Sequence, residues 1–195
     1  MTPRGDREPD DERSEGSDYE GAVQRSPETP RSRNTRYRMS TGLAAQGVDF
    51  LVLNDAGEHA FRINGRAISN DDTVQLEDLH GHVLYEAYAH AARKQSRIVI
   101  TDAIGMEIGW VVRQPVSPLR DRFAIELSSG KQLSVDGNVI KHEFSIFDSH
   151  GRVAEVSQKW FRARGSYGVE ILSGQQDGFL LTSLVVLDQM ILGTA

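Results

Sequence analysis

The feature that most constrains the fold is a repeat of strand-like segments that each run into a glycine. The glycines stand at Gly57, Gly81, Gly105, Gly130, Gly151 and Gly174, separated by 24, 24, 25, 21 and 23 residues. An Asn or Asp precedes four of them by three residues, as in Asx turns, and glycine accepts the positive φ that such turns need. A second alternating segment follows most turns, so the predicted unit is a β-hairpin of about 23 residues.

The number of these units predicts the architecture. Five hairpins, a first strand at 37–41 and a last strand before Gly174 make about twelve antiparallel strands. Short strands at even spacing favour a meander that closes into a barrel, because closure removes exposed strand edges. Such a barrel is too wide for wall side chains alone to fill and narrower than a water-filled porin. The sequence therefore predicts a mainly β fold, a closed barrel with a filled interior.

The segment after the last strand is the predicted filling. Asp177 can cap a helix, the next fifteen positions are mostly apolar, and Gly193 can end the helix. The polar residues gather on no single face, as expected for a helix buried all round. A membrane anchor and a partner-binding helix are the alternatives, although the segment is short for a membrane span. Asp188 is the odd carboxylate, which we expect to reach the barrel mouth or to pair with an arginine rather than act as a buried acid.

The first 35 residues differ in composition from the rest of the chain. They hold four of the six prolines, nine acids and six arginines but very few apolar residues. Such a segment cannot bury enough apolar surface to fold, so we predict a disordered leader at 1–35 and a barrel domain at 36–195. Cysteine is absent, which excludes thiol catalysis and disulfides. With no signal peptide or membrane span expected, we predict a cytoplasmic protein, peripheral at the membrane where it binds lipid.

Three phrases in the second half of the chain carry a family resemblance. They are VAEVSQKWF at 153–161, SYGVEI at 166–171, and the apolar run at 180–192. Together residues 36–195 resemble the LURP-one-related family, which belongs with Tubby C-terminal domains and phospholipid scramblases. The resemblance implies a twelve-stranded barrel around a central hydrophobic C-terminal helix, and relatives that bind phosphoinositides or associate with membranes. A cysteine-rich palmitoylation segment and a following membrane helix are absent, which argues against lipid scrambling.

Charge is distributed unevenly along the repeat. In a regular meander the glycine turns lie at one end of the barrel and the connections between hairpins at the other. The turn segments sum to -8 and the connections to +7. The predicted binding residues for an anionic phospholipid or other phosphate ligand are Arg93, Lys94, Arg97, Arg113, Arg120, Arg122, Lys159, Trp160, Phe161, Arg162 and Arg164. Neither of the two most basic connections contains an acid, so we expect the counter-charge to come from phosphate or from the acidic leader.

Two other interpretations of these charges stay open. The basic loops can simply keep a β-rich protein soluble. Alternatively, the barrel can be a frame for a protein-interaction or regulatory scaffold in which the acidic leader recruits a protein partner. No catalytic motif emerges: His80 and His82 lack a third metal ligand at suitable spacing, and no nucleophile elbow or phosphate loop occurs. We therefore predict a protein that is not an enzyme, needs no cofactor or metal, and binds no nucleic acid.

Overall fold

The computed structural model describes residues 34–41, 50–65, 73–89, 97–117, 120–161 and 165–192. In these residues twelve strands form one closed antiparallel barrel, in which each strand pairs with its neighbours in chain order and β1 pairs with β12. The strands are β1 (Thr35–Thr41), β2 (Phe50–Asn54), β3 (His59–Gly65), β4 (Thr73–Glu77), β5 (Val83–Ala89), β6 (Arg97–Asp102), β7 (Glu107–Ser117), β8 (Arg120–Leu127), β9 (Gln132–Asn138), β10 (Glu143–Asp148), β11 (Gly151–Ser157) and β12 (Ser166–Ile171). Two short 3-10 helices, η1 (Val139–Lys141) and η2 (Gln158–Trp160), connect strands, and α1 (Asp177–Leu192) follows β12. The predicted twelve-stranded barrel is confirmed.

The glycine turns form as predicted. All six glycines have positive φ, between 79° and 87° at five of them and 145° at Gly151. The side chains of Asn54, Asp78, Asp102 and Asp148 each accept hydrogen bonds from backbone N–H groups two to four residues ahead. The same four hairpins each contain a register shift just before the turn. The β8–β9 hairpin has Leu127 at the Asx position and pairs without a shift. Among these five hairpins, the register shift therefore occurs only where an Asx side chain begins the turn.

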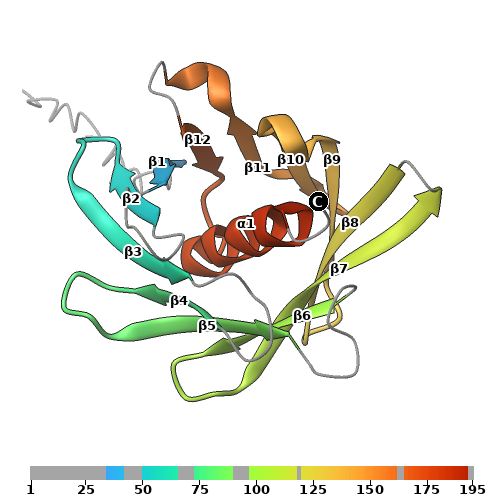
Figure 1. Ribbon diagram of the computed structural model, residues 1–195, viewed down its shortest axis with the longest axis horizontal. Coiled ribbons are helices and arrows are strands. Elements are labelled where there is room, and N and C mark those ends of the chain that lie inside the picture. Colours follow the sequence, from blue (N-terminus) through green and yellow to red (C-terminus); the bar gives the residue numbers. More distant parts are fainter. Residues whose placement is uncertain are drawn as a thin grey trace, which may run out of the picture. The chain divides into compact units, whose positions relative to one another are not determined.

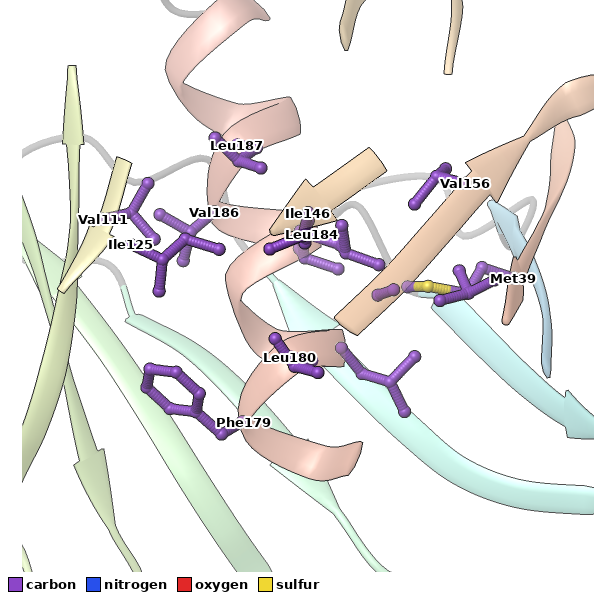
Figure 2. Packing of buried hydrophobic residues seen from close by; sticks show 14 of the residues in the cluster. Met39, Val111, Ile125, Ile146, Val156, Phe179, Leu180, Leu184, Val186 and Leu187 are labelled. Atoms are coloured by element: carbon purple, nitrogen blue, oxygen red, sulfur yellow. The ribbon is translucent and has the colours of Figure 1, made fainter. Parts of the chain in front are cut away.

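The interior of the barrel is filled by α1. Every residue from Phe179 to Leu187 is buried, and strands encircle the helix in Figure 1. Figure 2 shows Leu184 beside Ile146, and Val186 near Val111 on the opposite part of the wall. The helix is thus buried inside the barrel, as expected for a helix that is apolar on all sides.

Polar groups along α1 are satisfied locally. The hydroxyls of Thr182 and Ser183 donate to the carbonyls four residues earlier, each at 2.8 Å. At the start of the helix, the Tyr37 hydroxyl donates to Asp177 at 2.7 Å. Burial and the neighbouring carboxylate raise the pKa of Tyr37 far above its usual value, so this tyrosine keeps its proton. No helix in the described part of the chain combines the length and apolar character needed to cross a bilayer.

The start of the folded domain lies slightly earlier than the predicted first strand. β1 begins at Thr35 rather than at Tyr37, and the Asn34 side chain donates to Glu170 at 3.1 Å. The predicted disordered leader otherwise lies outside the described residues, as does Gly193, the predicted helix stop.

Candidate functional site

The two ends of the barrel differ as the hairpin repeat predicts. Strand pairing places the six glycine turns at one end, which we call the turn end, and the connections between hairpins at the other, the connection end. The two most basic connections precede β6 and follow β11. Arg97, which opens β6, and Lys159, which follows β11, are the basic residues of these connections that the structure describes. Their strands are five places apart in a ring of twelve, so these two residues lie on different parts of the wall. Arg93, Lys94, Arg162 and Arg164 lie outside the described residues, as does the side chain of Arg120.

On the β6 side, Arg97 is held against the outer wall. Its guanidinium lies 4.0 Å from the centre of the Trp110 ring, a cation–π contact. The Trp110 indole N–H donates to Glu126 on the next strand. Arg113 and Arg122 lie further along the long β7–β8 hairpin seen in Figure 1, where Arg122 is exposed.

On the β11 side, the two 3-10 helices lie next to each other and carry exposed side chains. The backbone N–H of Gln158 donates to the carbonyl of His142 at 3.0 Å, which places η2 beside the end of η1. We call the exposed side chains of these helices the η1–η2 shelf. The shelf consists of Ile140, Lys141, Gln158, Lys159 and Trp160. Ile140 is 75% exposed and Trp160 39% exposed, so the shelf presents apolar and cationic groups together.

Lys159 on this shelf has a counter-charge that the sequence segments did not reveal. Its ammonium lies 3.2 Å from Glu143, the residue that opens β10, while its own side chain is 81% exposed. Burial opposes ionisation of Glu143, but hydrogen bonds from Lys159 and Ser157 and the lysine charge outweigh it and lower the pKa of this carboxyl. For Lys159, the expectation that the counter-charge comes from phosphate or from the leader was wrong, because Glu143 of the neighbouring strand supplies it.

The aromatic residues after β11 fold down against the outer face of the wall. Gly168 on β12 faces outward, and a Cβ at this position would overlap the Trp160 ring and lie 2.9 Å from the Phe161 ring. Arg36 lies 5.8 Å from the centre of the Trp160 ring, and Arg38 lies 5.7 Å from that of Phe161. These two arginines were not predicted as site residues. They alternate with the buried Tyr37 and Met39 in β1, and this alternation could have indicated that both arginines face outward.

A polar cluster sits where α1 approaches the connection end. Nε2 of His142 lies 3.0 Å from Oδ1 of Asp188, and the Tyr167 hydroxyl donates to Oδ2 at 3.1 Å. The His142 and Tyr167 rings stack with their centres 4.2 Å apart. Burial, followed by the charge of Asp188, raises the pKa of Tyr167 well above its usual value. Asp188 therefore lies towards the barrel mouth, which was the first of the two expectations. Its partners among the described residues are a histidine and a tyrosine rather than an arginine.

The histidine pair singled out by the sequence belongs to a turn. The His80 and His82 ring centres are 6.0 Å apart, and Nδ1 of His82 lies 3.0 Å from Asp78. Asp78 also accepts the backbone N–H groups of both histidines. Both histidines are therefore part of the β4–β5 turn.

Comparison with known proteins places the chain in a family. The sequence model of the LURP-one-related family matches residues 37–188. An uncharacterised protein of Bacillus subtilis strain 168, YxjI, is 26% identical over 143 residues, which cover 73% of this chain and 85% of YxjI. A protein of Arabidopsis thaliana solved by X-ray crystallography has a similar fold, with a TM-score of 0.58 and 17% identity over 83% of this chain and 94% of the plant chain. The chain belongs to the LURP-one-related family.

Proposed function

We propose that this protein is a non-enzymatic module that docks reversibly on anionic, phosphate-bearing membrane surfaces through the connection end of its barrel. The observation that carries the proposal is the composition of the η1–η2 shelf. Two exposed lysines, Lys141 and Lys159, belong to the same pair of hydrogen-bonded 3-10 helices as an exposed isoleucine and a half-exposed tryptophan. Tryptophan favours the headgroup region of a bilayer, and lysine can bury its alkyl chain while its ammonium stays in water.

The size of the shelf predicts weak binding. Lys141 near an anionic surface contributes about 1 kcal/mol, Lys159 contributes less because Glu143 already pairs with it, and complete burial of Ile140 would contribute about 1.5 to 3 kcal/mol. With a smaller share from Trp160, the sum is roughly 4 to 6 kcal/mol, which corresponds to a dissociation constant between about 1 mM and 0.05 mM. Binding of this strength is reversible and responds strongly to salt. In this proposal, Arg162 and Arg164 in the connection after η2 strengthen binding to the anionic surface further.

Vesicle sedimentation tests the proposal directly. The full chain should bind phosphatidylcholine vesicles that contain phosphatidylserine, bind less as salt rises, and ignore pure phosphatidylcholine. Ile140→Ser with Lys141→Glu, or Arg162→Glu with Arg164→Glu, should reduce binding to the level of neutral vesicles. Ile104→Ser is the matched control, because Ile104 is 81% exposed but lies at the turn end. Equal binding to neutral and anionic vesicles would refute the proposal.

A protein-interaction scaffold is the second candidate function. It is favoured by three exposed apolar side chains at the turn end, Leu79, Ile104 and Met106, which are 64%, 81% and 59% exposed. They lie on the β4–β5 and β6–β7 hairpins, which adjoin because β5 pairs with β6. A chain that ignores every vesicle but self-associates, and loses that association with Ile104→Ser plus Met106→Ser in sedimentation velocity, would support this function instead.

A further inference from the structure

We infer that Asp188 on the central helix positions the η1–η2 shelf, with His142 as the link between them. The inference deepens the proposed function and rests on it for the vesicle measurement below. It assigns a role to the carboxylate of the apolar central helix, whose side chain is 12% exposed.

His142 connects the helix to both parts of the shelf. Its side chain contacts Asp188 of α1 at 3.0 Å, and a carboxylate oxygen can only accept, so Nε2 donates this hydrogen bond. Its backbone N–H donates to Val139 of η1 at 3.0 Å, and its carbonyl accepts from Gln158 of η2 at 3.0 Å. Both 3-10 helices are therefore bonded to the one residue that also reaches into the barrel.

The acceptor at the inner end of this link is fixed in place. The Asp188 side chain is 12% exposed, and its second oxygen accepts from Tyr167, whose ring stacks on His142 at an angle of 16°. Tyr167 itself is buried and paired in the barrel wall. The His142 ring is thus held by one hydrogen bond and one stacked ring, from two different elements.

The backbone of His142 needs such support. Among the residues that the structure describes, His142 is the only one other than glycine with a positive φ. Its φ is 49° and its ψ is 44°. Residues with a side chain avoid this region unless surrounding contacts hold them there. Because this conformation turns the chain from η1 into β10, losing the bond to Asp188 should loosen the shelf while the strands stay paired.

A matched pair of substitutions separates this link from general stability. His142→Gln can place an amide nitrogen near the position of Nε2, whereas His142→Asn is too short to reach Asp188. Asparagine tolerates positive φ better than glutamine does, so a purely conformational role for His142 would make Asn the milder change. The inference predicts the reverse order, with Gln close to the natural protein. Asp188→Ala removes the acceptor and should behave like His142→Asn.

Trypsin measures the shelf without any lipid. In native conditions, cleavage after Lys141 and Lys159 should be several-fold faster in His142→Asn and Asp188→Ala than in His142→Gln or the natural chain. Cleavage after Lys131 is the internal control, because this residue follows the β8–β9 turn at the opposite end. Equal acceleration at Lys131, or shelf cleavage that is the same in the Asn and Gln variants, would overturn the inference. If Asp188→Ala fails to fold, the comparison of His142→Asn with His142→Gln still tests the inference.

Vesicle binding then connects the link to the proposed function. Binding to anionic vesicles should fall in His142→Asn and recover in His142→Gln, although neither change touches a shelf side chain. If the natural chain binds no vesicle but the cleavage order holds, the proposed function fails and the positioning role of Asp188 stands. If the chain binds vesicles and both His142 variants bind equally well, the positioning role fails and the proposed function stands.

Discussion

Replacing Leu184 by alanine should destabilise the protein by roughly 3 to 5 kcal/mol. Leu184 is 1% exposed and lies midway along α1, where Figure 2 shows it beside Ile146 of the wall. Removing three buried carbons forfeits about 2.4 kcal/mol at ~0.8 kcal/mol per carbon. The cavity that remains adds to this loss when the surroundings cannot relax, which brings leucine truncations to about 2 to 5 kcal/mol. We expect the upper part of that range, because each wall strand is hydrogen-bonded on both sides and cannot move inward.

Urea unfolding monitored by circular dichroism measures the effect, with the slope of the transition checked for constancy. Leu51→Ala is the matched control, because Leu51 is 38% exposed on the wall strand β2, and it should cost less than about 1 kcal/mol. Leu184→Met keeps the volume and should cost less than about 1.5 kcal/mol. A loss below about 1 kcal/mol in Leu184→Ala would refute the reasoning, since it would mean that the wall does not enclose this side chain tightly.

Three further predictions concern other parts of the chain. Limited proteolysis should remove residues 1–33 and leave a core beginning near Asn34 with unchanged thermal stability; a shortened chain that unfolds would contradict this. Gly168→Ala should displace the Trp160 ring, whose fluorescence should shift to longer wavelength in a variant with the other tryptophan replaced, and an unchanged spectrum would argue against the contact. Hydrogen bonds from the His82 backbone, ahead of the opposing effect of burial, lower the pKa of Asp78 from 3.8 to about 2. Its stabilising contribution is therefore complete above pH 3.8 and lost as the pH falls towards 2. Asp78→Asn keeps the turn acceptor, so the variant should lose less stability between neutral pH and about pH 3, and an equal loss in both proteins would count against this role.

The parts of the fold that could be predicted depend on local chemistry. An Asx side chain and a glycine three residues later are enough to close a turn, so four of the six turns at one end followed from this pair, and the spacing of the glycines located the other two. The buried helix followed from the absence of a polar face along 177–192. These features need no knowledge of which strands meet across the barrel.

The contacts within the candidate site depend on register, which short sequence windows do not contain. Asp188 and His142 are separated by 46 positions, and they meet only because α1 runs back along the barrel after β12. The ion pair between Lys159 and Glu143 also depends on register, because the pairing of β10 with β11 brings these residues together. Gly168 could have predicted the position of the aromatic rings, because an outward-facing glycine in a strand leaves room that an aromatic ring can fill.

The position of α1 in the chain has a consequence for biosynthesis. The ribosome makes all twelve wall strands before it makes the helix that fills them, and β1 pairs with β12, the last strand to emerge. The nascent chain must therefore keep its inward-facing side chains from other partners until the helix is available, because only then can the barrel close on a complete interior. Pairings this distant in sequence form slowly, and exposed apolar surface in an unfinished chain invites aggregation. Nonsense mutations and stalled translation near the helix should therefore yield insoluble rather than partly active fragments, which expression of a chain stopped at residue 176 would reveal.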